Sequence, residues 1–185
     1  MSQSKNDGAS NVQLNVMGLL AEKGVKIREK QSADQLSSRG YGVAEKDGSL
    51  LNFCEALYLV DRGMLEVKDK KGGKLDFRQL LQHHEKSNDN AWSEYLVYRD
   101  LRSRGYVVRE GFGSGVDFRA YDRGEYAKDA ARYLIVNIQE GKPTPIAELT
   151  NALTQSISLK KELVLAVVNR RGEIVYYSVS QLTLP

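Results

Sequence analysis

The sequence predicts an α/β (α+β) protein built from two regions that each mix strands and helices. Three observations support this class. Short β-rich runs are bounded by Gly, Asn and Asp, other stretches place apolar residues at helical spacing, and a polar break, Ser87–Asn90, separates the regions. A chain of 185 residues with 41% hydrophobic content can bury one large core or two small ones. No internal repeat is evident.

The first region, residues 12–87, is predicted to be a small α/β domain that follows a disordered tail at residues 1–11. The turn signal EKG joins its first two strands, and Gly63 and Asp76 mark the end of one helix and the start of another. The predicted elements are strands at 13–20 and 24–29, helices at 32–38 and 51–63, a strand at 65–69 and a helix from 77.

The second region, residues 88–185, is predicted to form a sheet of about five strands flanked by two helices. Its first helix places Trp92, Tyr95 and Tyr98 at three-residue spacing and ends at Gly105. A second helix starts at Pro145, a residue suited to a first turn. The predicted strands are 106–110, 116–121, 132–138, and a hairpin of 162–168 and 173–179 across the sequence NRRG.

Composition restricts the possible environment and partners. The net charge of +3 and the pI near 8.9 favour an anionic partner only mildly, so a nucleic-acid ligand would need positive charge gathered on a folded surface. The apolar run Leu163–Val168 is far shorter than the roughly 20 residues of a membrane helix. The N-terminus lacks the apolar core of a secretion signal. We therefore expect a cytoplasmic protein without membrane contact.

A metal-bound active site has weak support in the sequence. Asp117 stands on a suitable strand for a magnesium-dependent nuclease, but the next strand offers neither an acidic residue nor a lysine. A zinc site has less support, because Cys54 is the single cysteine and the adjacent His83 and His84 do not complete a tetrahedral set. Cys54 is instead expected in the core, and we expect no metal or cofactor.

RNA cleavage without metal has more support. It needs a base for the ribose 2'-hydroxyl, an acid for the leaving 5'-oxygen and a cation for the negative charge of the transition state. Tyr121 ends a strand between Arg119 and Arg123, and could act as the base. Lys161 could be the cation. Taken alone, the residues favour structural positions over catalytic ones: an amphipathic strand end for Tyr121 and a solvated helix terminus for Lys161.

Three segments resemble the archaeal tRNA-splicing endonuclease family: YLVYRDLRSRGYVVREGFGSGVDFRAYDRG, KKELVLAVVNRRGEIVYY and EALYLVDRGMLEV. The resemblance implies a small N-terminal α/β domain followed by a C-terminal restriction-endonuclease-like mixed β-sheet flanked by helices. It also implies metal-independent cleavage of precursor tRNA at bulge-helix-bulge junctions, which leaves 2',3'-cyclic phosphate and 5'-hydroxyl ends. Tyr121 matches the family tyrosine, Lys161 matches the family lysine, and Ala130 occupies the position of the family histidine.

Ala130 leaves the general-acid position without a proton donor. The change is either deliberate or a natural loss, and the presence of both Tyr121 and Lys161 favours a single change over long decay. Thr154 and Ile157 also differ from the family arginine and histidine in the helix before the lysine. Two alternatives therefore stay open: a non-catalytic structural or RNA-binding subunit of the same complex, and a metal-dependent nuclease.

Partners follow from charge and from the family assembly. The candidates for contacts with RNA phosphates are Arg119, Arg123, Lys128, Arg132 and Lys160. The resemblance implies a tetrameric assembly with other endonuclease subunits on a precursor tRNA. The family's docking loop is usually acidic in self-assembling members, whereas here it carries Arg170 and Arg171, which favours a different partner subunit over identical ones. The terminal β-rich segment invites pairing with another chain.

Overall fold

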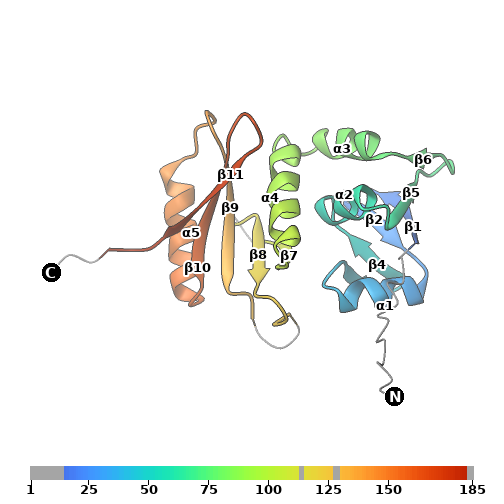
Figure 1. Ribbon diagram of the computed structural model, residues 1–185, viewed down its shortest axis with the longest axis horizontal. Coiled ribbons are helices and arrows are strands. Elements are labelled where there is room, and N and C mark those ends of the chain that lie inside the picture. The colour runs from blue at the N-terminus through green and yellow to red at the C-terminus, as the bar shows by residue number, and fades with distance from the viewer. Residues whose placement is uncertain (1–14, 113–114, 127–129, 183–185) are drawn as a thin grey trace, which may run out of the picture.

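A computed structural model describes residues 15–112, 115–126 and 130–182. The predicted tail at residues 1–11 lies outside these ranges. Figure 1 shows two sheets, with helix α4 (Ala91–Ser103) standing between the second sheet and the first half of the chain. The predicted α/β (α+β) class and its two-part architecture are confirmed.

The first sheet has six strands in the order β3-β4-β2-β1-β5-β6. Neighbouring strands are antiparallel, except that β1 and β5 are parallel. The short hairpin of β3 and β4 was not among the predicted strands, because β3 is exposed throughout and shows no alternation of apolar and polar residues. The strands are β1 (Val16–Ala21), β2 (Gly24–Ile27), β3 (Val43–Glu45), β4 (Gly48–Leu51), β5 (Leu65–Lys68) and β6 (Lys74–Leu75).

Three helices belong to this half: α1 (Lys30–Ser38), α2 (Phe53–Asp61) and α3 (Phe77–Glu85). Asp76 caps α3 as predicted, because its side chain accepts a hydrogen bond from the Gln79 amide at 2.8 Å. Helix α2 packs against β5 and β2 as well as against α4. It begins later than predicted, because Leu51 ends β4.

The second sheet has five strands in the order β11-β10-β9-β8-β7. Strands β9 and β10 are parallel and are connected through helix α5 (Ile146–Ser158), whereas the other neighbours are antiparallel. The predicted five-stranded sheet with two helices is confirmed. Its strands are β7 (Val107–Glu110), β8 (Phe118–Tyr121), β9 (Tyr133–Gln139), β10 (Glu162–Val168) and β11 (Ile174–Val179).

The two helices cover opposite faces of this sheet, as the alternation along β9 shows. Ile135 belongs to the apolar cluster that contains Tyr98 of α4. Its neighbours Leu134 and Val136 belong to the cluster that contains Ala152 of α5. Successive side chains of a strand point to opposite faces, so the continuous apolar run of β9 is that of a strand buried on both sides.

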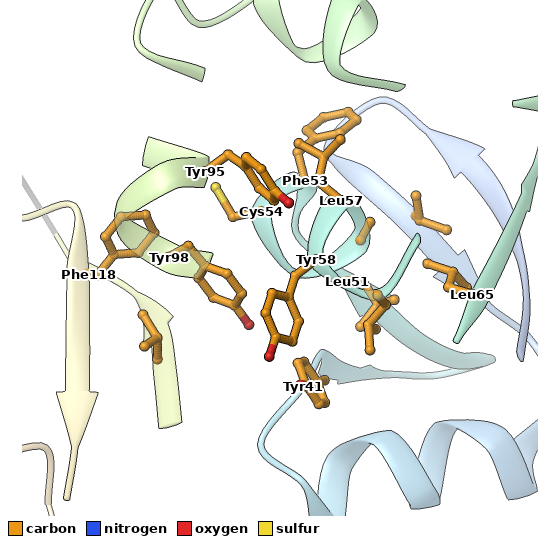
Figure 2. Close-up of a cluster of buried hydrophobic side chains, with 14 of the residues drawn as sticks. Tyr41, Leu51, Phe53, Cys54, Leu57, Tyr58, Leu65, Tyr95, Tyr98 and Phe118 are labelled. Atoms are coloured by element: carbon orange, nitrogen blue, oxygen red, sulfur yellow. The ribbon is translucent and has the colours of Figure 1, made fainter. Parts of the chain in front are cut away.

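The contact between the two halves is extensively buried. One apolar cluster includes residues of both sheets and of α2 and α4. Figure 2 shows its aromatic part, where the Tyr58 ring meets the edge of Tyr98 at a centroid distance of 5.9 Å. The Ser87–Asn90 turn connects α3 to α4, and the predicted boundary between residues 87 and 88 stays a prediction. None of the helices in the described ranges has the length and apolarity needed to cross a bilayer.

A buried ion pair adds to this contact. Arg109 Nη1 of β7 lies 2.9 Å from Glu55 Oε1 of α2, and the Glu55 side chain is only 2% exposed. Arg109 also donates hydrogen bonds to the carbonyl oxygens of Gly40 and Gly42. Burial raises the pKa of Glu55, while Arg109 and the amides of Asn52 and Gly42 oppose this effect.

Candidate active site

Strand topology brings Tyr121, residues 130–132 and Lys161 to one edge of the second sheet, the lower edge in Figure 1. Strand β8 ends at Tyr121 and runs antiparallel to β9, so its carboxyl end lies beside the start of β9. Strands β9 and β10 are parallel, so their amino ends lie together. The backbone amide of Arg132 donates to Ala120 at 3.0 Å, and that of Glu162 donates to Arg132 at 3.0 Å. The three strand ends are therefore held in register.

The end of α5 positions Lys161. The Lys161 amide donates to the Ser156 carbonyl at 2.8 Å, and the Lys160 amide donates to the Ile157 carbonyl at 3.0 Å. Lys160 has a φ of 54°, in the left-handed region usually occupied by glycine after a helix. This turn leads into β10 with the half-buried Lys161 side chain directed at the neighbouring strand. Its Nζ donates a hydrogen bond to the Ala131 carbonyl oxygen.

Ala130 is exposed and lies next to the residue that accepts the Lys161 hydrogen bond. Its side chain is a methyl group and transfers no proton. Both histidines of the chain, His83 and His84, lie on α3 in the first half, where each ring contacts Phe53. The position that the family resemblance assigns to an acid therefore lies beside Lys161, and it holds no acid.

Tyr121 is half-buried, and its ring meets the Tyr126 ring edge-on at a centroid distance of 5.1 Å. The two flanking arginines contact other groups. Arg119 Nε donates to the Glu110 carbonyl at 3.0 Å, and its guanidinium lies over the Phe112 ring. The Arg123 side chain packs against Gly105, where an added Cβ would lie 3.0 Å from its Nε.

Arg132 has two carboxylate partners at this edge. Its guanidinium lies 3.1 Å from Asp122 Oδ2 and 2.9 Å from Glu162 Oε1, and it also covers the Tyr133 ring. The hydrogen bonds to Glu162 and Asp122 raise the pKa of Arg132. Arg132 thus joins the ends of β8, β9 and β10, and an RNA phosphate would compete with two carboxylates for it. Lys160 is exposed beside Lys161, and Lys128 lies outside the described residues.

The surface next to Lys161 is hollowed. A cavity of about 400 Å³ lies between α5 and the end of β11. The residues that line it include Ile157, Lys161, Glu162, Ser178 and Gln181. Thr154, the other residue that departs from the family pattern, is exposed on the same helix, and its hydroxyl donates to the Thr150 carbonyl.

Metal-ligating side chains gather elsewhere. Within the described ranges, one grouping of three such residues occurs, formed by Cys54, His84 and Glu94. Asp117, the carboxylate considered from the sequence for magnesium, precedes β8 at the end opposite Tyr121 and accepts a hydrogen bond from the Asn137 amide at 2.6 Å. Cys54 and the histidines were recognisable from the sequence as possible metal ligands, but Glu94 was not, because only the packing of α2, α3 and α4 brings the three together.

Comparison with known proteins identifies the family. Residues 16–81 match the family described as tRNA intron endonuclease, N-terminal domain, and residues 91–176 match the tRNA intron endonuclease, catalytic C-terminal domain. A tRNA-splicing endonuclease of Methanococcus vannielii is 35% identical over 165 residues, which cover 89% of this chain and 93% of that protein.

Two further relatives carry the same name. The Methanococcus maripaludis protein is 34% identical over 165 residues, covering 89% of this chain and 93% of the relative. The Thermococcus onnurineus protein is 34% identical over 163 residues, covering 87% and 92%. Both halves of the chain are thus matched, over nearly the full length of each relative, and the chain belongs to the tRNA intron endonuclease family.

Proposed function

We propose that this chain is a subunit of a tRNA-splicing endonuclease and that its second sheet carries the cleavage site, or the remnant of one. The strongest support is that β8 ends at the same side of the sheet at which β9 and β10 begin. Tyr121 ends one strand there, and Lys161 Nζ donates to the carbonyl of Ala131, the residue after Ala130. The proposed base, the acid position and the cation would thus come from three adjacent strand ends.

Each residue would act at a defined atom of a precursor tRNA at a bulge-helix-bulge junction. Tyr121, as the phenolate, would take the proton of the ribose 2'-hydroxyl as that oxygen forms its bond to phosphorus. Lys161 would stabilise the negative charge on the nonbridging oxygens with the N–H donors that Ala131 leaves available. The bond from phosphorus to the 5'-oxygen then breaks, which leaves a 2',3'-cyclic phosphate and a 5'-hydroxyl. No metal ion takes part in these steps.

The departing 5'-oxygen needs a proton, and Ala130 has none to give. Water would have to supply it. General acid catalysis by a positioned side chain contributes about 10² to 10⁴-fold to a rate. We therefore expect slow cleavage by this chain.

Substitution at residue 130 tests the proposal. Ala130→His should raise the single-turnover cleavage rate of a bulge-helix-bulge RNA by about 10² to 10⁴-fold. Ala130→Gln is the matched control, because glutamine adds a polar side chain without a proton to transfer near neutral pH. Equal rates for the two variants would count against a vacant acid position. The product ends should be 2',3'-cyclic phosphate and 5'-hydroxyl.

A second candidate function is that of a non-catalytic subunit that binds RNA or braces a catalytic partner. The residues at positions 130, 154 and 157 favour it, because none is a general acid near neutral pH or a planar cation for stacking on a base. Activity gained by Ala130→His would overturn this alternative.

The metal-dependent nuclease is the third candidate. Cleavage by the Ala130→His variant in excess chelator, with the fold verified by circular dichroism, would reject it.

We further propose assembly with other endonuclease subunits, in a tetramer. Two surfaces support it. Strand β11 is at the edge of the sheet and exposes about half of Val175 and Tyr177 (51% and 54%). The turn after β10 presents Arg170 and Arg171 to solvent, a charge that favours an acidic partner over a second copy of this chain. Mass measurement in solution, alone and with a candidate partner subunit, distinguishes the two; a homotetramer formed by this chain alone would contradict the partner choice.

A further inference from the structure

A cavity of about 750 Å³ lies between the two halves of the molecule, away from the proposed cleavage edge. It borders α2, the end of α3, α4 and the start of β8. Tyr121 is at the other end of β8. Its lining combines a thiol, an imidazole and several carboxyl groups, among them Cys54, His84, Glu94, Glu110 and Asp117. None of these side chains has a role in the cleavage chemistry described above.

Three of these side chains converge. The ligand atoms of Cys54, His84 and Glu94 all lie within 4.8 Å of one another. Ligand atoms bound to one tetrahedral zinc ion are about 3.3 to 3.6 Å apart, given Zn–S and Zn–N or Zn–O lengths of about 2.3 and 2.0–2.2 Å. Side-chain adjustments of roughly 1 Å would therefore bring the three ligand atoms to the separations found around one zinc ion. The fourth position would face the cavity.

The surroundings of the three side chains favour binding of a metal ion. The His84 ring stacks on Phe53 at a centroid distance of 4.5 Å, and its Nδ1 is buried without a hydrogen-bond partner among the described residues. One oxygen of Glu94 accepts a hydrogen bond from Asn88 at 2.9 Å, which orients the carboxylate. Cys54 is 4% exposed, and Figure 2 shows it beside the helix that carries Tyr95.

The cavity lining holds four carboxyl groups beside the cationic side chains of Lys23, Arg109 and Arg119. Burial raises the pKa of Cys54, and Glu94, Glu55, Glu110 and Asp117 raise it further. Burial also raises the pKa of Glu94, with smaller contributions in the same direction from Asp117 and Glu110. Arg109 compensates Glu55, but the other carboxyl groups of this cluster have no ion pair within the described ranges. A divalent ion would supply the missing positive charge and displace the thiol proton to solvent.

We propose that Cys54, His84 and Glu94 form a binding site for a first-row divalent metal ion, with Zn²⁺ as the best match to this ligand set. The ligands come from α2, α3 and α4. A bound ion would therefore clamp the first half of the molecule to the second and stabilise their contact.

The test uses the full chain, stripped with a chelator and returned to chelator-free buffer, with Zn²⁺ and Co²⁺ as probes. We expect one equivalent of metal per chain, a higher melting temperature with Zn²⁺, and a thiolate-to-cobalt charge-transfer band with Co²⁺. His84→Gln should weaken binding by more than about 100-fold, the upper end of what changes around a metal's ligands cost. His83→Gln is the matched control, because His83 is adjacent and outside the grouping, and it should bind normally.

Two results would overturn the proposal: absence of saturable one-to-one binding, or equal metal affinity of the His84→Gln and His83→Gln variants. Cys54→Ser should abolish the cobalt charge-transfer band, and a band that persists would contradict thiolate ligation. Where the buried Cys54 variant fails to fold, Glu94→Gln provides the second test, because that side chain is only partly buried and keeps its size. Glu94→Gln should weaken Zn²⁺ binding as His84→Gln does, and unchanged affinity would exclude Glu94 as a ligand.

Discussion

Removal of the Glu55 carboxylate should strongly weaken the contact between the two halves. In Glu55→Ala, three hydrogen bonds to the carboxylate are lost: those from Arg109 Nη1 at 2.9 Å, the Asn52 amide at 3.0 Å and the Gly42 amide at 3.1 Å. Removal of one member of a buried ion pair costs about 3 to 5 kcal/mol. Arg109 keeps two carbonyl acceptors, so we expect the lower end, about 3 kcal/mol. For a chain of this length, that loss lowers the melting temperature by about 6 to 12 °C.

The assay is urea unfolding followed by circular dichroism and Tyr or Trp fluorescence. Glu45→Gln is the control, because its ion pair with Lys26 is on the surface and should be worth about 1 kcal/mol or less. Burial raises the pKa of Glu55 in spite of its donors, so we expect desolvation to offset part of the ion pair. The double variant Glu55→Gln with Arg109→Met should therefore lose less stability than the sum of the single changes. A Glu55→Ala loss no greater than that of Glu45→Gln would refute this reasoning.

Four further predictions concern single side chains. The Tyr98 hydroxyl is buried without a hydrogen-bond partner among the described residues, so Tyr98→Phe should be neutral or stabilising by up to about 1 kcal/mol in urea unfolding at pH 7. Burial raises the pKa of Tyr95 to about 12. The protonated phenol therefore stabilises the folded state fully below pH 10, and this stabilisation should be lost between pH 10 and about 12. Thermal unfolding measured as a function of pH would show this loss, and Tyr95→Phe should reduce it. Lys160→Gly should stabilise the chain by about 0.5 to 1 kcal/mol, because glycine adopts the observed φ of 54° without strain, and a destabilised variant in urea unfolding would contradict this explanation of the turn. In the Ala130→His background, Tyr121→Phe should lower single-turnover RNA cleavage by at least about 10²-fold at unchanged substrate binding, and undiminished cleavage would remove Tyr121 as the base.

Regular elements with strong local signals were predictable. The second sheet was predicted strand by strand, because its strands are apolar runs separated by turns rich in Gly, Asn or Asp. The cap of α3 followed from Asp76, since capping depends on residues only three positions apart. The β3–β4 hairpin was missed, because β3 is exposed throughout and shows no apolar alternation. This short hairpin of the first half was therefore recognisable only in the folded structure.

The candidate site was predictable as a set of residues, without its contacts. Tyr121 and Lys161 stand at predicted strand ends, and the family resemblance pointed to Ala130. No local pattern indicated that Arg132 would have Asp122 and Glu162 as partners, because the strand register decides which charges meet. The roles of these residues in cleavage stay predictions.

The sequence by itself determined the periodicities, the turns and the residue types at the strand ends, because these depend on interactions between near neighbours. Only the tertiary structure decided which distant residues meet. Glu55 and Arg109 are 54 positions apart, and Lys161 is 30 positions from the carbonyl that it contacts. Cys54, His84 and Glu94 converge because three helices pack together. Such contacts depend on strand order and helix packing, which are set by burial of apolar surface across the whole chain and leave no local pattern.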